Sequence, residues 1–381
     1  MWAQNADHRM APVQYHTGKF PPAELDWKQL IPLIGPASAA LARYDGTLAA
    51  VPNPNVLLAP LATQEAVLSS KIEGTITTIA EVLQFEAEGR EAGKSPEKVA
   101  DIQEVLNYRR AMRHAVDQLK DLPLCQRVIK EAHRVLLAGV RGQDRKPGEY
   151  RRGPAWIGPA GCPVEQAKFV AISWEELPDG MSAWEKYIHA DAPDRLAQLA
   201  VLHVEFEALH PFMDGNGRMG RMFVPLFLFK AGLLSRPTFY ISAFFERHRD
   251  EYYERLRAVS RDGAWTEWVG FFLKAIQSQA EENQAKAQAI LKLYETKKTW
   301  MTESTRSLYA IHALDFLFRR PVFETSDFTG QKGIPKPTAH RILGLLRKHG
   351  MFRVLRESRG QRPGVLAFRE LLNIVEERDA F

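Results

Sequence analysis

The chain has 381 residues, of which 45% are hydrophobic and 25% are charged, so it is long enough for two or three globular domains. No apolar run approaches the roughly 18 residues that a membrane span needs, and the first twenty residues lack the apolar core of a signal peptide. Cys125 and Cys162 are too few for a disulfide framework and lack metal-site spacing. We therefore expect a cytoplasmic protein with no membrane partner.

The net charge of +5 is unevenly distributed along the chain. Residues 319–369 carry 12 Lys and Arg against 3 Asp and Glu, a balance of +9, which leaves −4 for the remainder. This asymmetry indicates a basic C-terminal module attached to a mildly acidic body.

The N-terminal part is predicted to be helical. Residues 1–55 are rich in Pro and Gly around one amphipathic stretch at 24–44, and residues 55–74 have helical periodicity that Gly74 ends. A charged segment at 86–99 separates this region from the next helices. We expect four parts: an N-terminal helical region at 1–95, a helical core at 96–285, a connector helix at 286–304, and a small domain at 305–381.

The middle of the chain is also predicted to be mainly α. Pro and Gly punctuate residues 148–173, which we interpret as an irregular hairpin around Ala155–Gly158. Periodic apolar residues predict helices at 124–139, 195–210, 218–234, 247–260 and, as a long charged connector, 265–295.

The stretch HPFMDGNGRMGR, residues 210–221, concentrates several chemical groups. His210 is expected to close one helix, because Pro211 cannot continue it without losing a backbone donor. Gly215 and Gly217 permit a tight turn whose amides converge on one point. Arg218 is expected to open the next helix, whose first turn offers free N–H groups and a positive dipole end. Together these features predict an anion-binding nest.

The remaining side chains of the motif suit phosphate chemistry. Arg218 and Arg221 lie three residues apart on one helix face, and their guanidinium groups match phosphate oxygens. Asp214 offers the hard oxygen ligand that Mg²⁺ prefers beside phosphates. His210 can accept a proton near neutral pH from an attacking hydroxyl. The combination predicts transfer of a phosphorus-centred group to a hydroxyl.

Each element of this motif also has a structural explanation when taken alone. Asp-Gly-Asn-Gly is usually a turn, a His beside Pro is often structural, and two arginines on a helix often face solvent. A zinc cluster of His203, Glu205 and His210 is disfavoured, because the segment lacks the i, i+4 His pair of a helical zinc site. The co-occurrence of all the elements favours the functional interpretation.

The motif resembles that of the Fic family, His-Pro-Phe-x-Asp/Glu-Gly-Asn-Gly-Arg-x-x-Arg, at every fixed position. The resemblance covers roughly residues 60–280. It implies a mainly helical core that moves AMP from ATP to a Ser, Thr or Tyr hydroxyl of a protein, with Mg²⁺ as cofactor. It further implies that His210 is the base and that Asp214 holds the metal. The implied ATP contacts are Gly215, Asn216, Gly217, Arg218, Gly220, Arg221, Ile157 and Gly158. Tyr253 falls where family members place a residue near the adenine, and its assignment rests on a weaker match.

The same resemblance assigns the hairpin at Trp156–Gly158 to the family's flap, which covers the nucleotide and pairs with a target segment as an added strand. Relatives often continue the flap with a proline run, whereas this chain has FVAIS. The detail of target docking at the flap exit therefore stays open.

A carboxylate near the end of an early helix raises a second question. Glu73 precedes the Gly74 stop, where the helix dipole makes an anion unfavourable by about 0.3–1 kcal/mol. Glu73 is either a solvated surface residue or the partner of a cation elsewhere. The stretch SSKIEGT also resembles the Fic inhibitory motif, with Ser69, Glu73 and Gly74 in place. That resemblance implies that Glu73 occupies Arg221 and misaligns ATP.

The basic end is predicted to be helix, turn, helix and two short strands, a pattern similar to a winged helix-turn-helix. In that arrangement the second helix enters a major groove of duplex DNA and the wing meets phosphates. The predicted DNA contacts are Lys336, His340, Arg341, Arg347, Arg359 and Arg362. Winged helices also serve as protein-docking modules, and the sequence leaves both roles open.

Several functions remain open at this stage. The leading hypothesis is an autoinhibited protein adenylyltransferase whose targets include other proteins and the chain itself, and which forms a homodimer as many family members do. The alternatives are a DNA-binding regulator that only senses ATP, a Fic enzyme that removes AMP with Glu73 positioning water, or use of another nucleotide donor.

Overall fold

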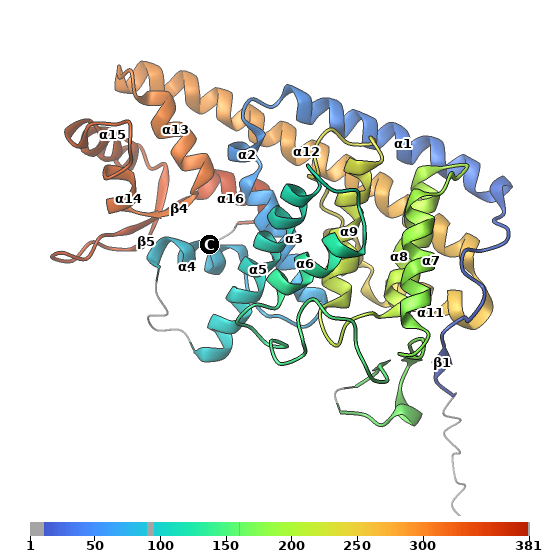
Figure 1. Cartoon of the computed structure of the whole chain (residues 1–381). Helices are drawn as coiled ribbons and strands as arrows, with labels where there is room; N and C mark the ends of the chain where they lie inside the picture. Colours follow the sequence, from blue (N-terminus) through green and yellow to red (C-terminus); the bar gives the residue numbers. More distant parts are fainter. Residues whose placement is uncertain (1–10, 90–94, 160, 380–381) are drawn as a thin grey trace, which may run out of the picture.

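The computed structural model describes residues 11–89, 95–159 and 161–379, and these form a mainly helical fold with two small sheets (Figure 1). The mainly α prediction is confirmed. Part of the charged segment 86–99 lies outside the described residues. Within the described ranges, no helix combines the length and the apolar character that crossing a membrane requires.

Two long helices, α1 (Trp27–Ala50) and α12 (Trp265–Thr305), lie side by side across one face of the molecule, although they are far apart in sequence (Figure 1). Asp26 caps α1, because its carboxylate accepts from the amides of Lys28 and Gln29. α1 continues to Ala50, six residues beyond the predicted amphipathic stretch.

The core is built around α8 (Arg195–Leu209), which is buried along nearly its whole length. Two tryptophans donate to its backbone carbonyls: Trp184 Nε1 to Leu202 O at 2.9 Å and Trp268 Nε1 to Ala200 O at 2.7 Å. The other core helices are α5 (Pro96–Gln118), α6 (Gln126–Leu136), α7 (Leu177–His189), α9 (Asn216–Lys230), α10 (Ser242–Arg247) and α11 (Arg249–Asp262).

The predicted helix at 55–74 is divided at Leu58 into α2 (Pro54–Leu57) and α3 (Ala59–Ile72). Glu73 caps α3, and Gly74 ends it at φ +95°, a conformation that favours glycine. α4 (Ile79–Glu88) follows with a capping box between Thr78 and Glu81. α3 packs on α5, α9 and α10, so its last turn lies near the start of α9 and the loop at residues 210–215 before it.

The predicted hairpin is present as β2 (Trp156–Ile157) and β3 (Phe169–Val170), with a 3-10 turn (Val164–Gln166) between them. A third strand, β1 (Val13–Gln14), pairs with β3 in parallel, so the sheet order is β1-β3-β2. The sequence predicts no strand at these residues. It is anchored to α8, since the half-buried Tyr15 donates to Glu205 at 2.6 Å and the buried His16 lies 2.8 Å from the same carboxylate.

The C-terminal elements form a helical unit around a sheet of order β4-β6-β5. They are α13 (Ala310–Arg319), β4 (Val322–Glu324), α14 (Thr325–Thr329), α15 (Lys336–Lys348), β5 (Phe352–Arg356), β6 (Val365–Phe368) and α16 (Arg369–Glu376). Residues 286–304 are the second half of α12, and Ala287 and Ile290 are buried there. The boundary expected between 285 and 286 therefore falls inside one continuous helix.

Candidate functional site

The motif loop joins the end of α8 to the start of α9 and is held by its own side chains. His210 adopts φ +48° and Gly215 adopts φ +77°. The Asn216 side chain closes the turn, because it accepts from the Phe212 amide and donates to the Phe212 carbonyl, both at 2.8 Å. The His133 ring stacks on Phe212 with a centroid distance of 3.7 Å. These contacts make the loop a defined turn.

His133 also fixes the position of Asp214. Its Nδ1 accepts from the Gly148 amide at 2.8 Å, so its Nε2 carries the proton and donates to the Asp214 carbonyl at 2.9 Å. Burial lowers the pKa of His133 to about 4, so the ring is neutral and this tautomer is maintained at neutral pH.

The first turn of α9 has the backbone geometry that anion-binding helix starts share. The helix begins at Asn216, two residues earlier than predicted, and its first closing bond runs from Met219 N to Gly215 O at 3.0 Å. The amides of residues 216–218 therefore precede the internal bonds of the helix. A Cβ at Gly217 would lie 2.2 Å from Glu73 Oε1, so this close approach requires glycine.

Glu73 reaches this site from α3 and pairs with Arg221. Arg221 Nη2 donates to Glu73 Oε1 at 2.7 Å and to the Ser69 carbonyl at 2.8 Å, while its Nε donates to Ser69 Oγ at 3.0 Å. The Arg221 side chain is 1% exposed and that of Glu73 is 35% exposed. Desolvation raises the pKa of Glu73, but the Arg221 guanidinium outweighs it and holds the pKa below its ordinary value.

His210 lies beside this ion pair as a neutral imidazole. Burial lowers its pKa to about 4. A neutral ring is the form that accepts a proton, so burial keeps His210 in the form a general base needs while lowering its proton affinity.

Arg218 is held between two carboxylates instead of pointing freely into the nest. Its Nη1 lies 3.3 Å from Glu104 Oε2 on α5, and its Nη2 lies 3.4 Å from Asp214 Oδ1. Thr75, directly after the Gly74 stop, donates to the same Glu104 oxygen at 3.0 Å. A hydrogen-bond network therefore connects the end of the Glu73 segment to the motif.

Asp214 fits the demands of a magnesium ion bound with phosphates. Its side chain is 40% exposed and lies at the mouth of the first turn of α9. The described ranges contain no group of three or more His, Cys, Asp and Glu that would hold a metal by themselves. Mg²⁺ beside a nucleotide usually takes only one or two carboxylates, with phosphates and water as the other ligands, so one carboxylate is sufficient.

Family models match most of the N-terminal two thirds of the chain. The Fic/DOC family N-terminal model matches residues 31–117, and the Fic/DOC family model matches residues 123–228, which includes the whole motif. Together they cover about half of the sequence. The chain belongs to the Fic/DOC family.

Curated Fic relatives match only part of their own length. "Protein adenylyltransferase Fic" of Drosophila willistoni is 29% identical over 192 residues, which are 50% of this chain and 35% of that protein. The protein of the same name from Culex quinquefasciatus is 30% identical over 146 residues, 37% of this chain and 25% of that protein. The chain thus matches about a third or less of the length of these relatives.

Solved Fic structures share the fold. A Fic family protein from Desulfovibrio desulfuricans G20 superposes with a TM-score of 0.56 at 19% identity, covering 89% of this chain and 95% of that one. A Fic domain containing signaling protein from Bacteroides thetaiotaomicron gives 0.55 at 19% identity, covering 68% and 97%. At these identities the likeness concerns the fold alone.

The other predicted nucleotide contacts come from the flap, from α11 and from the Fic motif itself. Ile157 and Gly158 are exposed on the β2 side of the flap sheet. Tyr253 on α11 lies beside the end of α3, with its hydroxyl 3.5 Å from the Ile72 carbonyl. Gly220 lies one turn into α9, where a Cβ would be 2.3 Å from Glu207 Oε1. Gly220 therefore leaves room for a buried carboxyl.

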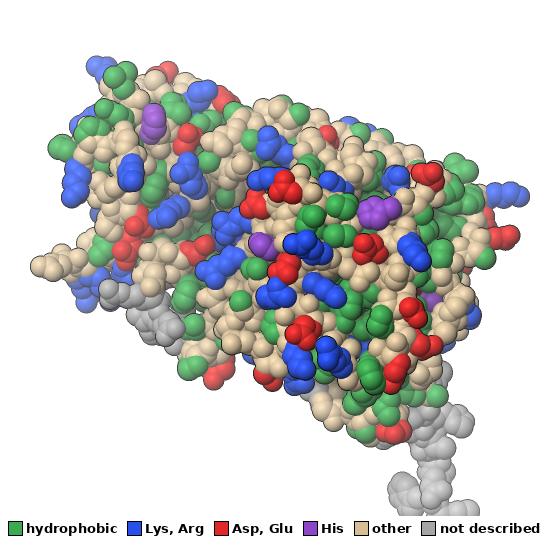
Figure 2. All heavy atoms as spheres, viewed as in Figure 1, with side chains coloured by type: hydrophobic (Ala, Val, Ile, Leu, Met, Phe, Trp, Pro, Cys, Tyr) green, Lys and Arg blue, Asp and Glu red, His purple; other side chains and the backbone are tan. Residues whose placement is uncertain are grey.

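The six predicted DNA contacts form a separate group. All are exposed on α15 and on the turn between β5 and β6, at the opposite end of the molecule from α7 and α11 (Figure 1). In Figure 2, several blue Lys and Arg side chains are scattered over this C-terminal unit, among green hydrophobic and tan groups. The contacts are Lys336, His340, Arg341, Arg347, Arg359 and Arg362.

Three residues that matter at the Fic motif were not found from the sequence. Glu104 pairs with Arg218, Glu207 is buried against Gly220, and Arg151 binds the His210 carbonyl at 2.9 Å. Glu207 lies three residues before His210 and therefore on the same helix face, and this spacing is a sequence signal that Glu207 lies near the motif. Glu104 and Arg151 come from distant segments and carry no local signal.

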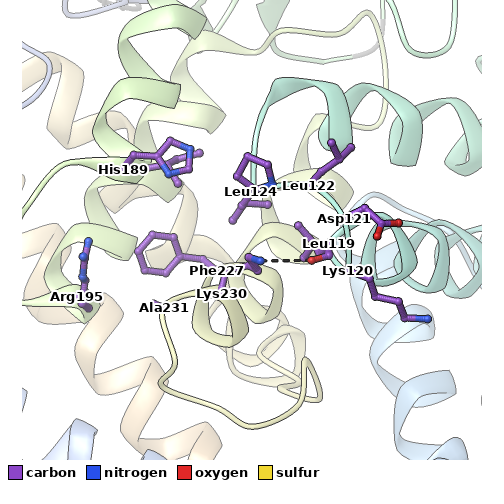
Figure 3. Close-up of a pocket in the computed structure, with 12 residues that line it drawn as sticks. Leu119, Lys120, Asp121, Leu122, Leu124, His189, Arg195, Phe227, Lys230 and Ala231 are labelled. Atoms are coloured by element: carbon purple, nitrogen blue, oxygen red, sulfur yellow. Dashed lines mark hydrogen bonds between the residues drawn. The ribbon is translucent and has the colours of Figure 1, made fainter.

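A hollow of about 480 Å³ lies away from the Fic motif (Figure 3). Its lining comes from the α5–α6 connection and from α7, α8 and α9, and includes Lys120, His189, Arg195, Phe227 and Lys230. Lys230 Nζ donates to the Leu119 carbonyl at 3.3 Å across it. No residue from 210–221 lines this hollow, so it is not the predicted nucleotide site.

Proposed function

We propose that this Fic/DOC protein transfers AMP from ATP to a protein hydroxyl and that Glu73 inhibits the transfer. The observation that carries this proposal is the Glu73 carboxylate, which lies over Gly217 and on Arg221. An anion of the chain itself thus occupies the place where the amides of the helix start and a buried guanidinium would hold phosphate. Relatives that match part of the chain are named adenylyltransferases, which agrees with this assignment.

In this proposal the hydroxyl oxygen of the target attacks the α-phosphorus of ATP. The new oxygen–phosphorus bond forms as the bond to the bridging oxygen breaks, and diphosphate leaves. His210, neutral at physiological pH, takes the hydroxyl proton. The amides at residues 216–218 stabilise the charge that grows on the α-phosphate oxygens.

The other motif residues hold the departing diphosphate. Arg218 would contact the β-phosphate and Arg221 the γ-phosphate, each through a planar guanidinium. Asp214 would hold Mg²⁺, which neutralises phosphate charge when it is bound. The flap would cover the nucleotide, and an extended target segment would add to the free edge of β2, where Trp156 and Ile157 are about 40% exposed.

The inhibition follows from shared occupancy of Arg221. While Glu73 holds the guanidinium, the γ-phosphate loses its partner and meets a negative charge. ATP is then placed poorly for in-line attack, and a displacement of about 1 Å can cost about two orders of magnitude in rate.

The decisive experiment is intact-mass measurement after incubation with ATP and Mg²⁺, with the protein itself and an added protein mixture as acceptors. We expect Glu73→Gly to add AMP to proteins far faster than wild type, and Glu73→Gly with His210→Ala to add none. Equal incorporation by wild type and Glu73→Gly would exclude the inhibitory role. Loss of AMP from a pre-labelled protein would instead indicate the reverse reaction.

We further propose that the C-terminal unit is a winged helix that binds duplex DNA. The order α14, α15, β5, β6 around a three-stranded sheet and the six exposed basic residues support this. The buried apolar residues of α15, Ala339, Ile342, Leu343 and Leu346, face inward, so its cationic side is the one that remains available. Retention on duplex DNA that declines steeply with salt would support the proposal.

A further inference from the structure

Arg151 is a buried arginine whose guanidinium donates hydrogen bonds to backbone carbonyls. The residue is 3% exposed and lies in the segment before β2. Its Nε donates to His210 O at 2.9 Å and its Nη1 to Gly153 O at 2.9 Å. Its Nη2 donates to the carbonyls of Ile172 and Leu209, the latter at 3.3 Å. Within the part of the chain that the structure describes, no carboxylate forms an ion pair with it.

These four carbonyls belong to three separate segments. Leu209 and His210 end α8, Gly153 precedes β2, and Ile172 follows β3. One guanidinium therefore connects the residue that carries the imidazole to both ends of the flap hairpin. A planar group with five donors can make these bonds together, whereas the single ammonium group of lysine cannot.

The backbone that Arg151 binds has an energetically unfavourable conformation at His210. His210 adopts φ +48°, a left-handed conformation that costs a non-glycine residue about 1–2 kcal/mol. The Arg151 amide adds a further bond, to the Pro211 carbonyl at 2.9 Å. Main-chain and side-chain donors of one residue thus fix both sides of the strained turn.

We propose that Arg151 is a positioning residue for the transfer reaction, which holds the His210 backbone and both ends of the flap as one unit. The proposal rests on the adenylyl transfer proposed above. The base and the target strand must keep a fixed distance from the α-phosphorus, and the Arg151 side chain bonds to the backbone that supports each of them.

The charge of Arg151 adds an electrostatic effect to this geometric one. After burial, the positive charge of Arg151 contributes to the low pKa of His210, while Glu73 opposes it. Arg151 therefore favours the neutral form of the imidazole, which is the form that can take the hydroxyl proton, and at the same time lowers its proton affinity.

The test uses Arg151→Gln and Arg151→Lys in the Glu73→Gly background. Arg152→Gln is the matched control, because Arg152 is adjacent, has the same charge and is exposed. We expect both Arg151 variants to lower kcat by about 10²-fold with little change in the KM for ATP, since the phosphate-binding residues are untouched. Arg152→Gln is expected to leave both constants unchanged.

The second readout is the titration of the His210 Cε1–H resonance by NMR, which does not depend on activity. We expect the pKa of His210 to rise in Arg151→Gln and to stay low in Arg151→Lys, which keeps the charge but loses the bridging bonds. The two readouts separate two effects of Arg151. Loss of its bridging bonds lowers kcat in both variants, whereas loss of its charge raises the His210 pKa in Arg151→Gln alone.

Two results would overturn the proposal. The first is a folded Arg151→Gln protein with unchanged kcat and unchanged His210 pKa, and the second is a change confined to KM. Should Arg151→Gln fail to fold, Arg151→Lys decides the kcat prediction. Should the Glu73→Gly parent transfer no AMP, the proposed function fails, and the NMR titration still shows whether Arg151 acts on His210.

Discussion

Glu73 Oε1 lies 2.7 Å from Arg221 Nη2, although the two residues are 148 positions apart in sequence. Ser69, one helical turn before Glu73, binds the same guanidinium through its hydroxyl and its carbonyl. The C-terminal turn of α3 is therefore built around Arg221. This cation is also what makes an anion acceptable at the negative end of a helix.

The pH dependence of the proposed inhibition follows from the direction of the Glu73 pKa. Because the folded-state pKa lies below the ordinary value, the carboxylate stays charged at neutral pH, and its bond with Arg221 is lost only as pH falls through that lowered pKa. We expect the activity ratio of Glu73→Gly to wild type to be about 10²-fold and constant from about pH 6 to 8. Initial rates of labelling from radioactive ATP would measure it. A ratio that falls steeply within this range would contradict the ion-pair account.

A substitution at Gly217 tests whether displacing the Glu73 carboxylate is enough to activate the protein, or whether the space beside Gly217 must also stay empty for phosphate. A Cβ at this position would lie 2.2 Å from Glu73 Oε1 and 2.9 Å from Arg221 Nη1, so Gly217→Ala should displace the carboxylate. The same methyl group fills the space that a phosphate would need. We therefore expect Gly217→Ala to remain inactive, and Gly217→Ala with Glu73→Gly to lose most of the activity of Glu73→Gly, on the order of 10²-fold.

The control for this experiment is Gly344→Ala on α15, where a Cβ meets nothing within 4 Å. It should leave the rate of the Glu73→Gly protein unchanged. Activation by Gly217→Ala alone would show that the phosphate does not lie where Glu73 lies.

The sequence was sufficient for the helices and for the motif because both are local patterns. The period of apolar residues, the Pro211 break and the Gly215 turn each act within a few residues, and the structure has a helix end, a turn and a helix start there. The helix start was predicted two residues late. Gly217 was counted only as a turn former, whereas Asn216, through its bonds to Phe212, already lies in the first turn.

Contacts between distant segments could not be read from the sequence alone. β1 joins the flap sheet through a parallel pairing with β3 across more than 150 residues, and two-residue strands give no periodic signal. Arg151 appeared as one of two arginines in a Pro- and Gly-rich segment, and nothing local distinguishes it from the exposed Arg152. The partner of Glu73 was proposed only through family resemblance, since composition and spacing left its environment open.

Glu207 offers a prediction on stability as a function of pH. Burial raises its pKa to about 7, so the folded protein retains a proton that the unfolded chain has already lost above about pH 4.5. The free energy of unfolding therefore falls as pH rises from about 4.5 to 7 and then stays at the lower value. Glu207→Gln should remove this loss and stabilise the protein at pH 7.5 by on the order of 1–3 kcal/mol.

The measurement for Glu207 is chemical unfolding at several pH values between about 4.5 and 8. Glu185→Gln is a suitable comparison, because Glu185 accepts from the Gln126 amide in a peripheral contact and is not part of the motif. The gain of Glu207→Gln should grow with pH and level off above about pH 7. A gain that is the same at all pH values would show that Glu207 does not titrate in this range.

The proposed DNA interface is tested by the salt dependence of binding. Each phosphate contact contributes a slope of about −0.9 to the dependence of log K on log salt, so the loss of Lys336 and Arg341 together should make the slope shallower by nearly two. Both side chains are exposed on α15, and neither forms an ion pair among the described residues.

Fluorescence anisotropy with a labelled duplex would compare the double variant Lys336→Gln, Arg341→Gln with Arg255→Gln. Arg255 is half-buried on α11, outside the C-terminal unit, and bonded to Glu251, so its substitution should leave the slope unchanged. A steep slope that the double variant retains would place the DNA elsewhere, and a salt-independent or absent interaction would favour protein docking by the C-terminal unit.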